Sequence, residues 1–199
     1  MIKTSDNVFC VSGSPKTATT SVCHVFSEIF KENGYTVEEF NGPFRHAVAD
    51  CKYLIVCVRH PFEHVKSAYR YFKQFNNPKL KPIVPVALEG WSKFATTWDG
   101  NYSGCSSNDF VAMGDYFVRQ EAIEEDVNKI CQIFNLYVPE DLEFPHLLKT
   151  KNKERLVLTK DKKEAINKNF DRVIKLYSEF ETGNPQGRLG ARDERKKRK

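Results

Sequence analysis

The chain has 199 residues, of which 40% are hydrophobic and 29% are charged, a balance typical of one soluble globular domain with a buried core. It carries no apolar run long enough to span a membrane and no signal-peptide pattern, so we expect a cytoplasmic protein without a transmembrane segment. The net charge of +5 is concentrated at one end: residues 183–199 hold seven basic and two acidic side chains, which leaves 24 of each sign in residues 1–182. This distribution argues against specific nucleic-acid binding, and predicts a single domain over residues 1–182 followed by a disordered basic tail over residues 183–199.

The six cysteines show no metal-ligand or redox spacing, because no CxxC pair occurs among them. They are Cys10, Cys23, Cys51, Cys57, Cys105 and Cys131. We expect reduced thiols that pack as small hydrophobic side chains, and no bound metal.

The first half of the chain alternates between strand and helix patterns. Residues 8–12 form a short apolar run, and residues 20–32 place apolar side chains at helical spacing up to Gly34. Residues 35–40 form a second strand candidate. Residues 53–58, YLIVCV, form a continuous apolar run typical of a strand covered on both faces, and Pro61 suits the first turn of the helix that follows.

The second half is less regular. Residues 76–108 read as an insertion with some helix, a candidate lid or acceptor wall. A strand is predicted at 116–118, an amphipathic helix at 123–134, and one final helix that opens with a capping box of Asp161 and Glu164. The alternation predicts an α/β, three-layer, P-loop-like fold with a short central parallel β-sheet flanked by helices.

A loop rich in hydroxyl groups connects the first strand to the first helix. Its sequence over residues 11–21, VSGSPKTATTS, combines helix N-terminal amides, the charge of Lys16 and several hydroxyl donors, which together predict a phosphate or sulfate cradle. The Walker glycine before the lysine is missing, and Arg59 stands where a Walker B carboxylate would follow the 53–58 strand. A nucleoside triphosphatase is therefore disfavoured.

A second anion-binding candidate follows residues 53–58 in the stretch VRHPFEHVKSAY. Arg59 comes at the carboxyl end of the predicted strand, where ligands of open α/β sheets bind. Ser67 follows two helical turns into the next helix, on the same face as His60 and His64. A guanidinium and a hydroxyl placed together favour a second phosphate on the same ligand.

These stretches resemble the donor-binding motifs of the sulfotransferases that use 3′-phosphoadenosine 5′-phosphosulfate (PAPS). PKTATTS is similar to their 5′-phosphosulfate loop, and Arg59 with Ser67 resembles their 3′-phosphate motif. DYFVRQEAIEEDVNKICQIFNL looks like the RxE segment of carbohydrate-type members, without their membrane anchor. The resemblance implies that the donor contacts Pro15, Lys16, Thr17, Ala18, Thr19, Thr20, Ser21, Arg59, Ser67 and Arg119.

This resemblance also implies a reaction and its participants. A sulfuryl group would pass from PAPS to a hydroxyl or amine of a small-molecule or glycan acceptor, leaving adenosine 3′,5′-bisphosphate, with no metal required. Lys16 would neutralise charge on the leaving phosphate. Of the possible general bases we favour His46 for its pKa range, with Glu38, Glu39 and Asp50 as alternatives, although His46 also fits a plain surface loop.

Two points of this sequence depart from the family pattern: Ala18 replaces the usual loop glycine, and His64 stands where many relatives carry arginine. Two other functions stay open, a P-loop nucleotide kinase and a non-catalytic module that binds nucleotides or sulfated glycans. The acceptor is not identified by the sequence. Its candidate aromatic contacts, equally compatible with the core, are Tyr71, Phe72, Trp91, Trp98 and Tyr102.

Overall fold

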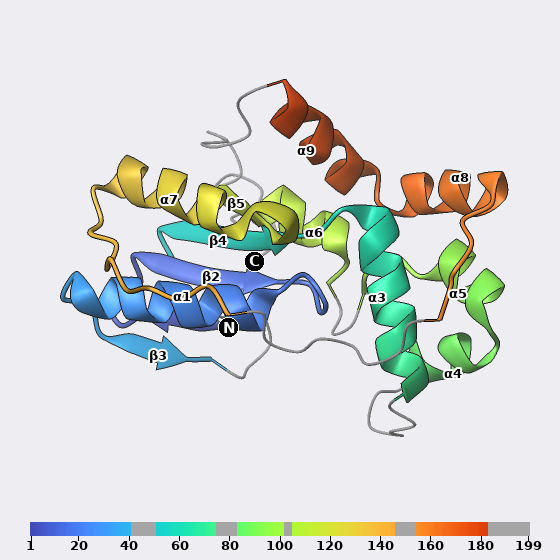
Figure 1. The fold of residues 1–199 in the computed structure, drawn as a ribbon, viewed down its shortest axis with the longest axis horizontal. Helices are drawn as coiled ribbons and strands as arrows, with labels where there is room; N and C mark the ends of the chain where they lie inside the picture. The colour runs from blue at the N-terminus through green and yellow to red at the C-terminus, as the bar shows by residue number, and fades with distance from the viewer. Residues whose placement is uncertain (41–50, 75–82, 102–104, 146–153, 183–199) are drawn as a thin grey trace.

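The computed structural model describes residues 1–40, 51–74, 83–101, 105–145 and 154–182, with the backbone alone described at 83–85. It is an α/β structure whose sheet has the strand order β3-β1-β2-β4-β5 (Figure 1). The strands are β1 (Ile2–Thr4), β2 (Phe9–Gly13), β3 (Val37–Glu39), β4 (Tyr53–Val58) and β5 (Tyr116–Arg119).

The sheet is mixed, which corrects the prediction of a parallel sheet. The pairs β2·β4 and β4·β5 are parallel, as predicted, but β1 pairs antiparallel with both β2 and β3. The cause is a tight turn after Thr4, in which Asn7 adopts φ 58° and the Asp6 carboxylate accepts the backbone N–H of Val8. This turn folds residues 2–4 back onto the edge of β2, so that β1 separates β2 from β3.

Helices connect and cover these strands. They are α1 (Thr19–Glu32), α3 (Pro61–Gln74), α4 (Ile83–Leu88), α5 (Trp91–Thr97), α6 (Ser107–Met113), η2 (Gln120–Ala122), α7 (Ile123–Phe134), α8 (Lys160–Asn169) and α9 (Asp171–Glu181). Helix α1 follows the predicted apolar spacing closely. Its end is closed by Gly34 at φ 81° and by a Tyr35 N–H bond to the Phe30 carbonyl, an arrangement that satisfies the last carbonyls of the helix.

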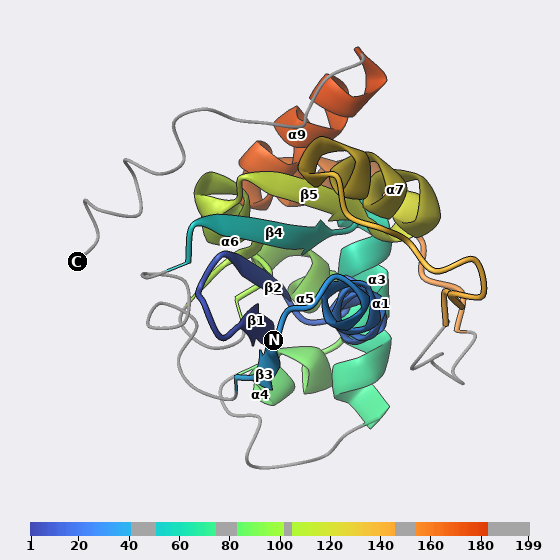
Figure 2. The ribbon, with the colours of Figure 1, turned by 90° about the vertical axis from the view of Figure 1, so that its left-hand side faces the viewer.

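The sheet lies between two apolar cores, because alternate strand residues point to opposite faces. Val11, Ile55 and Val118 pack with α1 and α7 on one face. Leu54 and Phe117 pack on the other face with residues of α3, α5, α6, α8 and α9. In Figure 1 helices α3, α4, α5 and α8 gather at one end of the sheet, and in Figure 2 helices α7 and α9 lie next to the edge strand β5.

Aromatic rings fill the amino ends of the three parallel strands. Phe9 of β2 stacks on Phe30 at a centroid separation of 4.9 Å and meets Phe134 edge-on at 4.9 Å. Phe134 also contacts Tyr53 of β4 and Tyr116 of β5 at 4.7 and 4.9 Å. This aromatic cluster joins β2, β4, β5, α1 and α7 at the end of the sheet opposite the loop at residues 14–18.

Two predictions about the C-terminal half are wrong. The predicted final helix is two helices that meet at Phe170, whose ring is fully buried against Trp98 and His64. The predicted Asp161–Glu164 capping box does not form, since Thr159 is the N-cap and makes no side-chain cap bond. A capping box forms instead between Ser106 and Asp109 at the start of α6. Helix α6 begins at Ser107, inside the range assigned to the insertion.

All six cysteines are described and buried, and none forms a disulfide, which confirms the expected packing role of the thiols. Among the helices that the structure describes, none is long and apolar enough to cross a membrane.

Candidate functional site

The loop between β2 and α1 lies at the carboxyl ends of the parallel strands, beside the end of β4. The approach is close at Gly13: a Cβ atom there would lie 2.8 Å from both the Cys57 carbonyl oxygen and the Thr19 hydroxyl. Glycine is therefore required where the chain leaves β2, and the loop is held against β4, the strand that Arg59 directly follows.

The loop backbone has the alternating conformation of an anion-binding nest. Lys16 and Ala18 have φ values of 69° and 63°, in the left-handed region, and Thr17 between them does not. Ala18 is the N-cap of α1, and no side chain caps that end of the helix. The first amides of α1 and those of the loop can therefore bind an anion. The left-handed backbone at Ala18 is a conformation that glycine adopts with less strain than alanine.

Two of the loop hydroxyls hold the loop itself. The buried Thr17 hydroxyl donates to the Ser14 carbonyl at 2.6 Å, and the buried Ser14 hydroxyl donates to the Gly100 carbonyl at 2.9 Å. Thr19, which is half-buried, shares a 3.1 Å hydrogen bond with Thr17, and Thr20 is exposed. Ser21 is buried. Thus Thr19 and Thr20 lie where an external ligand can reach them, whereas Thr17 and Ser14 shape the loop.

His64 fixes the loop from the α3 side. Its Nε2 lies 2.6 Å from the Pro15 carbonyl oxygen, its exposed fraction is 1%, and its ring packs edge-on against Trp98 and Phe170. The pKa of His64 is lowered to about 4, mainly by burial and also by the charges of Arg59 and Lys16, against the opposing effect of the Pro15 bond. The ring is therefore neutral near pH 7, with Nε2–H donating to Pro15.

Lys16 and Arg59 bring two positive charges together. The Arg59 Nη1 donates to the Lys16 carbonyl at 3.3 Å, and the Lys16 ammonium lies 4.5 Å over the Tyr71 ring. Burial lowers the pKa of both groups, and the charge of Arg59 lowers the pKa of Lys16 further. Among the described residues, neither forms an ion pair within 4.0 Å, and the Arg59 Nε is buried without a hydrogen-bond partner. Two positive charges thus lie close together at this loop, and the nearest opposing charges on Arg59 are those of Glu121 and Glu63.

Ser67 of α3 follows Arg59 in the chain, and a small cavity lies beside the loop. Ser67 lies on α3 two turns beyond Arg59 and is 6% exposed. Beneath the loop, Ser14, Thr17, Arg59 and Ser107 help to line a cavity of about 10 Å³, which is room for about one water.

Arg119 is at the end of β5 and binds neighbouring carboxylates. It forms two hydrogen bonds to the buried Asp126, from Nε at 2.8 Å and from Nη2 at 2.7 Å, and its guanidinium lies 4.5 Å over the Phe180 ring. The Asp126 bonds raise its pKa. Glu121, two residues later, accepts the backbone N–H of His60 at 3.1 Å and the hydroxyl of Tyr177 at 2.8 Å. The contacts assign both residues a bracing role; donor binding by Arg119 stays a prediction.

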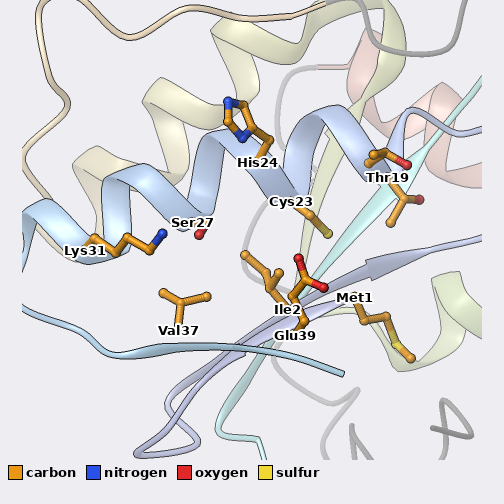
Figure 3. Close-up of a pocket in the computed structure, with 10 residues that line it drawn as sticks. Met1, Ile2, Thr19, Cys23, His24, Ser27, Lys31, Val37 and Glu39 are labelled. Carbon is orange, nitrogen blue, oxygen red and sulfur yellow. The ribbon is translucent and has the colours of Figure 1, made fainter. Parts of the chain in front are cut away.

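The candidate bases separate into three groups. His46 and Asp50 lie outside the described residues. Glu38 pairs with Lys3 at 3.6 Å. Glu39, one residue later and thus on the other face of the sheet, lines a groove together with Thr19 and Thr20 (Figure 3).

Gly100 has no obvious signal in the sequence, because its contact with Ser14 spans 86 positions of the chain. Tyr71, predicted as an acceptor contact, lies beneath the Lys16 ammonium, and Glu121 of the RxE segment accepts the His60 amide. The predicted acceptor contact Trp98 is 5% exposed and packs in the core against Phe94. Tyr102 lies outside the described residues.

No protein family, no curated protein and no solved structure matches this chain.

Proposed function

We propose that the chain is a PAPS-dependent sulfotransferase with a P-loop-like fold. One observation carries the proposal: the guanidinium of Arg59, at the end of β4, meets the carbonyl of Lys16 in the loop after β2. The two segments to which we assign anion binding thus follow adjacent parallel strands. That arrangement suits one ligand with two separated anionic groups, such as a nucleoside 3′-phosphate with a 5′-phosphosulfate.

Each part of the site has a role in this proposal. The loop amides, Lys16, Thr19 and Thr20 hold the phosphosulfate, and Arg59 with Ser67 holds the 3′-phosphate. His64 keeps Pro15 and the loop in place without adding charge. Lys16 stands over Tyr71 in the present structure and would turn toward the leaving phosphate, where it stabilises the charge that develops there.

The reaction is an in-line transfer. The acceptor oxygen or nitrogen forms a bond to sulfur while the bond from sulfur to the bridging phosphate oxygen breaks. The electron pair of that bond stays on the phosphate, and the acceptor proton passes to a base of the chain. The products are the sulfated acceptor and adenosine 3′,5′-bisphosphate.

Ligand-dependent stability tests the proposal against a nucleotide kinase. We expect adenosine 3′,5′-bisphosphate to raise the unfolding temperature more than ATP with magnesium does, because a ligand that binds only the folded state stabilises it. Labelled PAPS with a panel of acceptors then separates an enzyme from a binding module. Stabilisation by ATP with magnesium alone would contradict the proposal.

A further inference from the structure

A groove runs along α1 on the side that faces β1 and β3. Its volume is about 540 Å³, within the range of ligand-binding clefts. The lining residues from α1 are Thr19, Thr20, Cys23, His24, Ser27 and Lys31, and those from the two strands are Met1, Ile2, Val37 and Glu39. Thr19 and Lys31 are twelve residues apart on one helix, so the groove is about 18 Å long.

One end of the groove meets the anion-binding loop. Strand β3 is antiparallel to β1, which is antiparallel to β2, so β3 runs in the same direction as β2. Glu39, the last residue of β3, therefore lies at the loop end of the sheet, and Val37 lies farther from it. Helix α1 runs the opposite way, from Thr19 at the loop to Lys31. Figure 3 shows this order, with Glu39 beside Cys23, one helical turn from Thr19, and Lys31 near Val37.

The lining suits a hydroxylated ligand of low net charge. Hydroxyls of Thr19, Thr20 and Ser27 run along one wall, and no aromatic ring is among the described residues that line the groove. Lys31 and Glu39 supply charges of opposite sign at opposite ends. Both are exposed, and neither has an ion-pair partner within 4.0 Å in the described part of the chain. A flat phenol would find no ring to stack on, whereas a sugar chain would find donors and acceptors along its length.

We infer that this groove binds the acceptor, and that the acceptor is an extended polyhydroxylated or amino-sugar chain. The inference rests on the proposed sulfotransferase function, because it places the reacting hydroxyl or amine beside Thr19 and Thr20, at the end of the loop that would hold the sulfuryl group. Glu39 lies at that same end, where a carboxylate can accept the proton of the reacting group.

Blocking the groove tests the inference. Ser27→Trp adds bulk at the middle of the groove, and Glu32→Trp adds the same bulk on an exposed position of α1 that does not line it. Calorimetry measures the binding of two uncharged ligands, an N-acetylglucosamine tetrasaccharide and cellotetraose, with and without saturating adenosine 3′,5′-bisphosphate. We expect Ser27→Trp to weaken tetrasaccharide binding at least about tenfold and Glu32→Trp to leave it unchanged, because only the first removes contact surface.

A second variant guards against misfolding of Ser27→Trp. Lys31→Gln leaves the helix intact and should weaken binding about fivefold, the effect of one lost charged hydrogen bond at an exposed position. Equal tetrasaccharide affinity in wild type, Ser27→Trp and Lys31→Gln would overturn the inference, as would binding of 2-naphthol with no binding of either tetrasaccharide.

The bisphosphate titration separates the two proposals. If adenosine 3′,5′-bisphosphate binds wild type and no saccharide does, the groove assignment is wrong while the donor site stands. If the protein does not bind the bisphosphate and does not turn over PAPS, the sulfotransferase proposal is wrong. The assignment of the groove as the acceptor site is then wrong as well.

Discussion

Acidification should destabilise the protein through His64. The ordinary pKa of histidine is 6.5, and burial lowers that of His64 to about 4. Below pH 6.5 this histidine is protonated in the unfolded chain but stays neutral in the folded protein. The free energy of unfolding that is present above pH 6.5 is therefore lost as the pH falls toward 4. Between about pH 8 and pH 5 this linkage removes on the order of 2 kcal/mol of unfolding free energy.

A comparison with His64→Gln isolates this effect. The glutamine amide can still donate to the Pro15 carbonyl, but it does not titrate, and all other ionisable groups stay the same. Denaturant unfolding of both proteins at several pH values should show that the variant loses about 2 kcal/mol less than wild type over that interval. Parallel pH dependence in the two proteins would refute a buried neutral His64.

Four further predictions concern the site. Lys16→Met should reduce PAPS turnover at least about 100-fold in a folded protein, because one lost contact to developing charge costs about 3 kcal/mol; wild-type turnover would remove Lys16 from the chemistry. Arg59→Ala should weaken bisphosphate binding more than Ser67→Ala, by about 1.5–3 against about 1 kcal/mol in calorimetry, and equal losses would contradict the assigned charges. Ala18→Gly should raise the unfolding free energy by about 0.5–1 kcal/mol, because the relief of left-handed backbone strain exceeds the cost of the added chain entropy. Ala18→Val should lower the unfolding free energy. An unchanged unfolding free energy in both variants would refute backbone strain at Ala18. His46→Ala should lower kcat about 10²–10⁴-fold with bisphosphate affinity unchanged; full activity there, together with loss in Glu39→Gln, would assign the base to Glu39.

Local apolar patterns correctly predicted those strands and helices whose bounds are set by residues close in the sequence. The strand at 53–58 and the helix start at Pro61 coincide with the structure, because a continuous apolar run and a proline each restrict the backbone within a few residues. Strand β1 was not predicted, since three residues give no periodicity and its pairing depends on a turn at Asp6 and Asn7. The break at Phe170 likewise depends on where its ring packs.

The sequence identified most of the residues of the candidate site, but only part of how they contact one another. The loop and Arg59 were found from their positions after two strands, and the structure brings them together. The bond from His64 to the Pro15 carbonyl joins residues 49 positions apart, so no motif indicates it. Arg119 was expected to face a ligand, yet its binding to Asp126 depends on the short turn η2 between β5 and α7.

The aromatic cluster gives the two ends of the sheet different local stabilities. Phe9, Tyr53 and Tyr116 tie the amino ends of three strands to two helices, whereas the carboxyl end carries left-handed residues and a pair of like charges. Native-state hydrogen exchange should therefore differ between the two ends of each parallel strand. We expect amides near the aromatic rings to exchange only through global unfolding, and amides near residues 14–18 to exchange through smaller local openings. A ligand at the loop would slow exchange mainly at the second group, because the first already has the full protection of the folded state.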